Sequence, residues 1–167
     1  MTKIFTAAFA ILIIALNFSA CKKKENKSSS EATSTVDSTQ IKQRTQLLTS
    51  GNWKMTAMTV SPGISSGGTI TTDWFSKLDT CSKDNFTTYY TNKQFVIDEG
   101  ATKCNINDPQ TTTGTWVFNS NATVLSLTQS GGNKTWNVIE LTNSNLKINY
   151  TASSSGETYT YSTTFTH

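Results

Sequence analysis

The sequence predicts an all-β domain: eight antiparallel strands in an up-and-down barrel, with a short N-terminal helix. The chain has 167 residues, of which 31 are threonine. A composition rich in β-branched and hydroxyl side chains favours strands over helices. Strand-like runs also follow one another at short intervals, separated by turns of Ser, Asn and Gly. Eight antiparallel strands in series are enough to close a sheet into a barrel.

The expected elements follow the chain in a simple order. A short helix comes first: Ser38 or Thr39 can cap it, Ile41 to Thr49 form it, and Gly51 ends it. The longest connection, Ser61 to Asp79, is rich in Gly and Ser and is expected to be a loop after the first strand. The eight expected strands are Trp53 to Val60, Phe86 to Thr91, Gln94 to Asp98, Gly114 to Asn119, Val124 to Gln129, Thr135 to Leu141, Asn145 to Ala152 and Glu157 to Thr166.

The register of the last three strands can be predicted from their charges and turns. Aligning Glu140 with Lys147 puts an opposite-charge pair on the solvent face. The remaining apolar and aromatic residues then share the inner face, and their pairs are Leu141–Leu146, Ile139–Ile148, Ile148–Tyr161 and Tyr150–Tyr159. A four-residue turn at Ser130 to Asn133 would put Trp136 on the opposite face from Ile139, so a bulge or a five-residue turn is expected there.

The N-terminal residues predict export and lipid attachment. Lys3 and the apolar run Ile4 to Leu16 have the length of a secretory signal peptide and not of a membrane span. The following Phe18-Ser19-Ala20 before Cys21 resembles the lipobox of bacterial lipoproteins, in which the leader is removed and the cysteine thiol is acylated. That resemblance makes residues 1–20 a lipoprotein signal peptide and Cys21 the lipidated residue. A plain secretory signal and an uncleaved anchor helix are the alternatives.

Residues 21–38 are expected to be a flexible tether, because this lysine-, serine- and threonine-rich stretch has too few apolar side chains to form a core. Its first lysines lie close enough to the lipid to be attracted to anionic headgroups. The folded domain is then 39–167, which carries nine Lys and Arg against eight Asp and Glu. A nearly neutral domain without a basic cluster argues against a nucleic-acid partner.

Cys81 and Cys104 remain once Cys21 is set aside, and in an oxidising compartment a disulfide between them is the economical interpretation. A two-residue hairpin at Asn92-Lys93 pairs residues whose numbers sum to 185, and these two cysteines have that sum. They would then face each other at the open end of the hairpin. Two buried thiols or a metal pair are the alternatives, although a zinc site needs more soft ligands than two cysteines.

Catalytic and metal sites have little support in the sequence. The one histidine is His167, at the end of the sequence, so a histidine base or metal ligand in a folded pocket is not expected. Neither an enzyme nor a cofactor is predicted. Carboxylates near the cysteines are hard oxygen ligands suited to calcium, but no calcium-loop spacing is present and turn formation explains them as well; they are Asp79, Asp84, Asp98, Glu99 and Asp108.

Aromatic side chains are the candidate lining of a binding pocket. An eight-stranded barrel is just wide enough to hold one small ligand or to be filled by its own side chains. Aromatic rings with hydroxyl groups could orient a ligand, yet the same rings could make a solid core. The candidates in the strands are Tyr90, Phe95, Tyr150, Tyr159 and Tyr161. In the long connection, Trp74 and Phe75 are expected either to form a lip on such a pocket or simply to cover the open end of the barrel.

The tripeptide Gly51-Asn52-Trp53 matches the Gly-x-Trp signature that opens the first strand of lipocalins. With the strand series, the leader and the stretch from Asp98 to Trp116, it makes the chain similar to the lipocalin-like lipoproteins of Bacteroidota, from Leu47 to Thr166. The resemblance implies that Trp53 plugs the closed end of the barrel, that Gly51 and Trp53 are structural, and that no catalytic residue is shared. The chain is shorter than vertebrate-type lipocalins and lacks their second, basic motif.

Two functions from different classes fit these features. The first is the binding of a small hydrophobic or amphipathic molecule by a lipid-anchored barrel in the bacterial cell envelope, at the periplasmic face or the cell surface. The second is a ligand-free interaction or scaffold module that contacts a protein partner or inhibits a secreted enzyme. An inhibitor of a basic enzyme is expected to be acidic, which this domain is not. The sequence identifies no particular protein partner.

Overall fold

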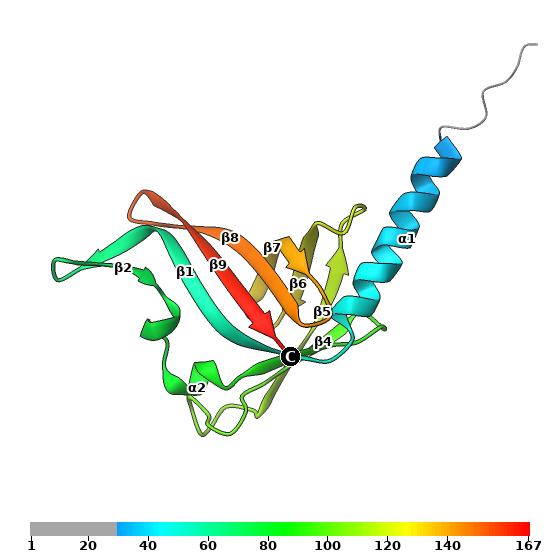
Figure 1. The fold of residues 1–167 in the computed structure, drawn as a ribbon. Coiled ribbons are helices and arrows are strands. Elements are labelled where there is room, and N and C mark those ends of the chain that lie inside the picture. Colours follow the sequence, from blue (N-terminus) through cyan, green and yellow to red (C-terminus); the bar gives the residue numbers. More distant parts are fainter. Residues whose placement is uncertain (1–29) are drawn as a thin grey trace, which may run out of the picture.

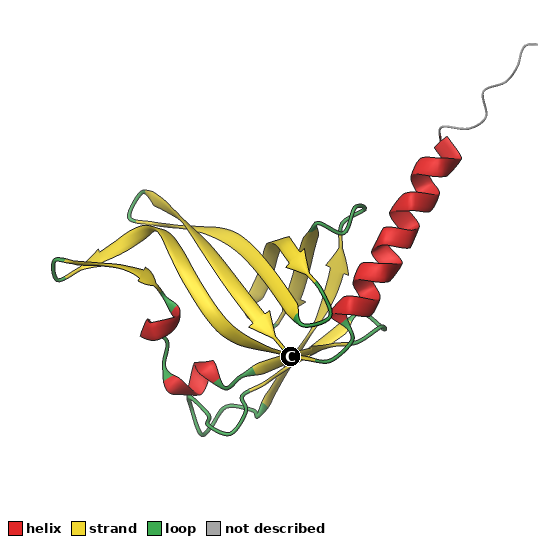
Figure 2. Cartoon of the chain, in the orientation of Figure 1, coloured by secondary structure: helices red, strands yellow, loops and turns green. Residues whose placement is uncertain are grey.

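The computed structural model describes residues 30–167. The expected signal peptide, the expected lipidation site Cys21 and the first part of the expected tether lie outside the described residues. In the described part, one N-terminal helix precedes a sheet of nine strands (Figure 1), and strands dominate the fold (Figure 2). None of the helices in this part of the chain is both long and apolar enough to cross a bilayer.

The helix α1 spans Ser30–Leu48 and begins well before the expected Ile41. The last nine residues of the expected tether are therefore helical. Neither Gly nor Pro interrupts this stretch, and Ser and Thr each cost less than about 1 kcal/mol in a helix. The hydroxyl groups of Thr49 and Ser50 donate to carbonyl oxygens of the last turn at 2.9 and 2.8 Å, which ends the helix. Only its C-terminal end packs on the barrel, and the rest extends away from it (Figure 1).

Eight of the nine strands close into the expected antiparallel barrel. Their order in the sheet is β2-β1-β3-β4-β5-β6-β7-β8-β9, and pairing of β1 with β9 closes the ring. Only β2 lies outside this ring, beside the distal half of β1. The fold-class prediction is confirmed, with one strand more than expected. The strands are β1 (Asn52–Ser66), β2 (Thr69–Asp73), β3 (Phe86–Tyr89), β4 (Gln94–Asp98), β5 (Thr111–Phe118), β6 (Val124–Gln129), β7 (Gly132–Leu141), β8 (Asn145–Ser154) and β9 (Glu157–Thr166).

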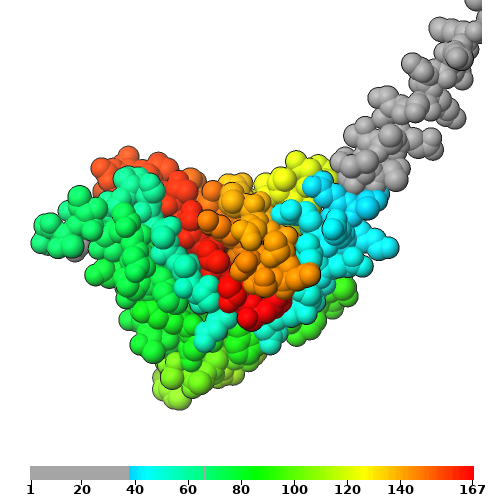
Figure 3. Space-filling model, in the orientation of Figure 1, coloured from blue at the N-terminus to red at the C-terminus, as the bar shows by residue number. Residues whose placement is uncertain are grey.

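The alternating strand directions gather the turns at two ends of the barrel. We call the closed end the one that holds the C-terminus of α1, the start of β1 and the β3–β4, β5–β6 and β7–β8 turns. The open end holds the β1–β2 hairpin, the segment 99–110 between β4 and β5, and the β6–β7 and β8–β9 turns. At the open end the β1–β2 and β8–β9 hairpins project beside each other (Figure 3), because β1 pairs with β9 along most of its length.

The connection Ser61 to Asp79 was expected to be a loop, and that prediction is wrong. Strand β1 continues to Ser66, β2 pairs back onto it, and a 3-10 turn, η1 (Phe75–Lys77), and a short helix, α2 (Thr80–Lys83), follow. The glycines Gly67 and Gly68 form the hairpin turn with positive φ angles of 59° and 82°. The β1–β2 pairing is interrupted around Pro62, which has no N–H group to donate.

A β-bulge in β7 changes the predicted register of the C-terminal half. The partners of Leu141 and Glu140 on β8 are as expected, but Val138 and not Ile139 pairs with Ile148. The extra residue at the bulge turns Ile139 outward, where it is 57% exposed, and leaves Val138 on the inner face at 8%. The β6–β7 turn has only two residues, so the expected irregularity is this bulge and not a five-residue turn.

The β8–β9 pairing lies two residues away from the prediction. The observed pairs are Tyr150–Tyr161 and Ile148–Thr163, in place of Tyr150–Tyr159 and Ile148–Tyr161. The cause is the position of the turn, because Ser155 and Gly156 take the positive φ angles, 53° and 82°, that a tight hairpin requires. A shift of two residues leaves every side chain on the same face of the sheet.

The expected disulfide joins Cys81 to Cys104, with the two Cα atoms 5.1 Å apart. Its predicted geometric basis is wrong, because the β3–β4 pairs, such as Tyr89 with Phe95, sum to 184 and not to 185. The turn between these strands is longer than two residues and places Lys93 at a φ of 70°. The bridge therefore joins α2 to the segment 99–110, beyond the ends of both strands.

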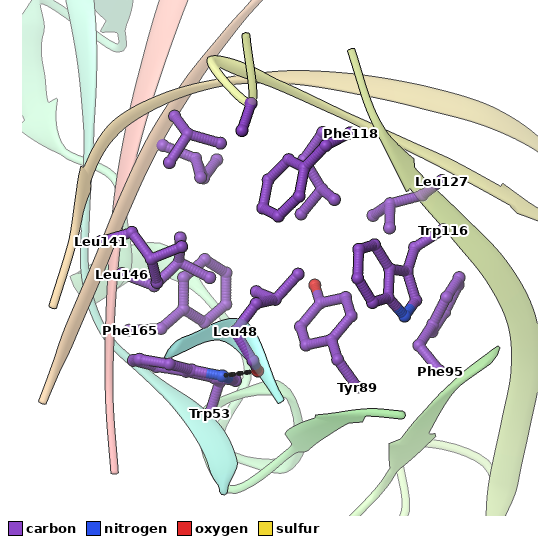
Figure 4. Packing of buried hydrophobic residues seen from close by; sticks show 14 residues of the cluster. Leu48, Trp53, Tyr89, Phe95, Trp116, Phe118, Leu127, Leu141, Leu146 and Phe165 are labelled. Atoms are coloured by element: carbon purple, nitrogen blue, oxygen red, sulfur yellow. Dashed lines mark hydrogen bonds between the residues drawn. The ribbon is translucent and has the colours of Figure 1, made fainter. Parts of the chain in front are cut away.

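The hydrophobic core fills the closed half of the barrel (Figure 4). Trp53 and Trp116 are its largest members, at 1% and 2% exposure. The indole N–H of Trp116 donates to the carbonyl oxygens of Tyr90, in the β3–β4 turn, and of Gln94, the first residue of β4, each at 3.1 Å. Phe95 packs against Gly114, where an added Cβ would lie only 2.5 Å from the phenyl ring. This half of the barrel is therefore solid.

Candidate functional site

The other half of the barrel contains a cavity of about 370 Å³ that opens to solvent. Strands β1, β7, β8 and β9 form its walls, and the apolar side chains that line it are Met55, Met58, Trp136, Ile148, Tyr150 and Phe165. Small-molecule sites in proteins typically have volumes of ~300–1,000 Å³. The cavity is thus large enough for one small ligand.

The strand register explains how these apolar side chains meet. A bulge in β1 between Met55 and Ala57 allows Met55 and Met58 to face inward although they are three residues apart. Across the cavity the ring of Trp136 stacks on that of Phe165, with centroids 6.1 Å apart and planes at 28°. Flexible methionine side chains beside a stacked aromatic pair make a wall that can adjust to the shape of a ligand.

Polar groups in the cavity are few. Its polar lining is Asn133, Lys134, Thr135, Thr151 and Thr163. Thr163 is 2% exposed and pairs with the inner-face residue Ile148, so it is part of the cavity wall. Lys134 pairs with the core residue Leu127, and directly opposed residues of an antiparallel pair point to the same face. Its side chain therefore starts from the inner face, close to the β6–β7 turn at the open end.

The predicted aromatic residues Tyr150, Tyr161 and Trp74 come together at the open end. The rings of Tyr150 and Tyr161 stack with centroids 5.3 Å apart, and Trp74 meets Tyr161 edge-on at 6.1 Å. Burial raises the pKa of Tyr150, and the neighbouring Tyr161 raises it further. The Tyr150 phenol therefore stays protonated at neutral pH and can donate a hydrogen bond. Of these three residues, only Tyr150 lines the cavity itself; Trp74 extends the aromatic surface at the rim.

Three other predicted ligand residues do not line the cavity. Tyr90 lies in the β3–β4 turn at the closed end and is 45% exposed. Phe95 is part of the solid core, with 1% exposure. Tyr159 lies near the tip of the β8–β9 hairpin, where its hydroxyl donates to the Glu157 carboxylate at 2.6 Å, and this hydrogen bond raises the pKa of Tyr159.

Sequence reasoning did not name Met55, Met58, Trp136, Thr163 or Phe165 as pocket residues, although all five line the cavity. The available signal was alternation: Thr163 and Phe165 are separated by one residue in β9, and both lie on the face of Tyr161. That signal was missed because the only candidates considered were tyrosines, Phe95 and the rim residue Trp74. For the two methionines the β1 bulge breaks the alternation, so no simple period reveals them.

The signature residues Gly51 and Trp53 lie at the closed end of the barrel. The indole N–H of Trp53 donates to the carbonyl oxygen of Leu48 at 2.8 Å. The ring of His167 covers the indole with centroids 3.9 Å apart, and it contacts the Asn52 carbonyl oxygen at 3.1 Å. An added Cβ at Gly51 would lie 2.7 Å from this imidazole. Glycine is thus needed there for His167 to pack on Trp53.

The carboxylates near the disulfide take part in loop structure. One carboxylate oxygen of Asp84 accepts hydrogen bonds from the N–H and the hydroxyl of Thr102, at 2.8 and 2.7 Å. The hydrogen bond from the Thr102 hydroxyl is the main cause that lowers the pKa of Asp84. Asp98 accepts in the same way from Gly100 and Gln110. Within residues 30–167, no group of three His, Cys, Asp or Glu side chains is placed to hold a metal ion.

A family model of the lipocalin-like domain matches residues 49–148, which is more than half of the chain. The chain belongs to the lipocalin-like domain family. Members of this family have a fold that typically binds small molecules and is not enzymatic. A lipocalin-like protein from Bacteroides uniformis, known from a crystal structure, has 16% sequence identity and a TM-score of 0.41, over 70% of this chain and 94% of that one. No curated protein matches the chain.

Proposed function

We propose that this lipocalin-like protein binds one small hydrophobic or amphipathic molecule in the barrel cavity, while a lipid on Cys21 anchors it in the bacterial cell envelope. The observation that carries the binding proposal is the contrast between the two halves of the barrel. The closed half is filled by large buried side chains, whereas the open half keeps a cavity of about 370 Å³. A barrel that serves only as a scaffold has no need for that space.

The lining of the cavity favours an apolar ligand with a small polar part. Six apolar or aromatic side chains line the walls, and covering them with a ligand would remove apolar surface from water at about 25 cal/mol per Å². The hydroxyl groups of Tyr150 and Thr163 supply polar contacts that can orient the bound molecule. A purely polar metabolite would leave the apolar wall without a partner.

A cavity-filling substitution tests the binding proposal. The neutral fluorescent dye N-phenyl-1-naphthylamine is titrated into the purified full chain and into Met55→Trp, whose larger side chain occupies the cavity. Val117→Trp is the matched control, because Val117 is 56% exposed on β5 and is far from the lining. We expect saturable one-to-one binding that Met55→Trp weakens by at least about tenfold and that Val117→Trp leaves unchanged. Dye binding that is absent, or equal in all three proteins, favours the ligand-free interaction module instead.

The anchoring proposal rests on the N-terminal sequence and is tested separately. Cells that express the chain are fed an alkyne-labelled fatty acid, and the membrane fraction is analysed for labelled protein. We expect label on the protein with Cys21 and none on Cys21→Ser, which should also leave the membrane fraction. Cys81→Ser/Cys104→Ser is the control that retains the label. Unlabelled protein with Cys21 intact would indicate a plain secretory signal.

A further inference from the structure

We propose that the cavity selects amphiphiles with a carboxylate headgroup, which Lys134 binds at the open end while the hydrocarbon chain lies against the apolar wall. This inference rests on the proposed function and names the ligand class of the same site. Its basis is the distribution of charge and apolar surface along the cavity. The lining contains one cationic side chain, Lys134, and no Asp or Glu.

The position of Lys134 is unusual for a lysine in a barrel. It pairs with Leu127, which is 4% exposed and belongs to the core, so Lys134 occupies an inner-face position. Its strand neighbours Asn133 and Thr135 are uncharged. Among residues 30–167 no ion pair involves Lys134, so its ammonium group is available to an incoming anion. A charge-assisted hydrogen bond between an ammonium group and a carboxylate is about twice as strong as a neutral one.

The apolar part of the cavity lies deeper than Lys134. Lys134 is the third residue of β7, next to the β6–β7 turn at the open end, whereas Phe165 and Ile148 continue into the core cluster. The stacked Trp136 lies between these two levels, two residues after Lys134. A ligand that follows this gradient places its charged head at the mouth and its tail toward the closed end. This order matches a ligand with one hydrocarbon chain and a carboxylate head. It disfavours a cationic amphiphile, because Lys134 would repel the cationic head.

Calorimetric titration with three probes of equal chain length tests the proposal. Decanoate, decanol and decylammonium carry the same hydrocarbon chain with a negative, neutral and positive head. We expect the native full chain to bind decanoate about tenfold more tightly than decanol, and decylammonium more weakly than both. Added salt should weaken decanoate binding and leave decanol binding unchanged, because Lys134 is at the solvent-exposed mouth.

Variants separate the charge of Lys134 from its effect on folding. Lys134→Met removes the charge but keeps an unbranched side chain only one atom shorter, and it should bring decanoate to the affinity of decanol. Lys134→Arg should keep the preference. Lys54→Met is the matched control, since Lys54 is exposed on the outer face of β1 beside the inward-facing Trp53. Equal binding of decanoate and decanol by the native protein, or a preference unchanged in Lys134→Met, overturns this inference and leaves the proposed apolar site intact. If neither decanoate nor decanol binds, the proposed function fails and the inference fails with it.

Discussion

The indole N–H of Trp53 donates a hydrogen bond to the carbonyl oxygen of Leu48, 2.8 Å away, and so joins the first strand of the barrel to the last turn of α1 (Figure 4). Both residues are buried, at 1% and 0% exposure. The carbonyl groups at the end of a helix have no partner within the helix. In the dry closed end, Trp53 therefore satisfies a polar group that water cannot reach, and at the same time plugs the barrel.

Trp53→Phe should destabilise the protein by about 1–3 kcal/mol, because it leaves the Leu48 carbonyl oxygen unpaired and creates a small void. Chemical denaturation followed by circular dichroism measures this change. The same substitution at the half-buried Trp74, Trp74→Phe, is the control and should cost less, because Trp74 lies at the rim of the open end. A larger loss for Trp74→Phe would contradict the role assigned to Trp53.

The disulfide should stabilise the fold chiefly by restricting the unfolded chain. Cys81 and Cys104 are 23 residues apart, and closing a loop of this length contributes about 3 kcal/mol in the loop-entropy model. The denaturation midpoint of the native protein should therefore fall when dithiothreitol is added. Cys81→Ala/Cys104→Ala should begin at the lower midpoint and show no response to the reductant. A double variant as stable as the oxidised protein would show that the bridge does not stabilise the fold.

Asp84 should make stability depend on pH in the acid range. Its pKa in the folded protein lies below the ordinary value of 3.8, mainly because the Thr102 hydroxyl donates to the carboxylate. Because the pKa of Asp84 is lower in the folded protein, ionised Asp84 stabilises the fold. This stabilisation is complete above the unfolded-state pKa and is lost as the pH falls through the folded-state pKa. Stability should thus decrease below about pH 4.

Thr102→Val removes the hydroxyl that donates to Asp84. The stability of the variant should still fall at acid pH, but by less than that of the native protein. Urea denaturation at a series of pH values between neutral and strongly acid measures the effect. Thr115→Val is the control, because Thr115 is an exposed strand position distant from Asp84. Identical pH profiles for Thr102→Val and the native protein would exclude this hydrogen bond as a source of the acid sensitivity.

The parts of the fold that the sequence predicts well are those with a local signal. The limits of β4, β6 and β9 agree with the prediction, since each is bounded by turn-forming residues. The pairing of Glu140 with Lys147 was predicted from the four-residue turn between the strands and from the opposite charges of the two residues. By contrast, the run Ser153-Ser154-Ser155-Gly156 offers several two-residue turns, and only the backbone conformation of Ser155 and Gly156 decides among them. The predicted tyrosine pairs failed for this reason.

The candidate site was harder to predict than the fold, because it depends on tertiary register. Trp74, Tyr150 and Tyr161 were chosen as aromatic residues, and the structure does bring them together. Tyr90 was placed in a strand, although it belongs to the closed-end turn. Lys134 became an inner-face residue only when the two-residue β6–β7 turn fixed its pairing with Leu127. A local pattern does not reveal such a pairing.

The bulge in β7 provides a sharp test of the observed register, because it reverses the faces of two adjacent residues. The predicted register puts Ile139 in the core, whereas the structure buries Val138 at 8% exposure and leaves Ile139 at 57%. Ile139→Lys should therefore change the free energy of unfolding by less than about 0.5 kcal/mol. Val138→Lys should cost at least about 3 kcal/mol or prevent folding, since it puts an unpaired charge into the core. Denaturant titration of the two variants distinguishes the registers: a severe loss for Ile139→Lys with a tolerated Val138→Lys would place the bulge elsewhere in β7.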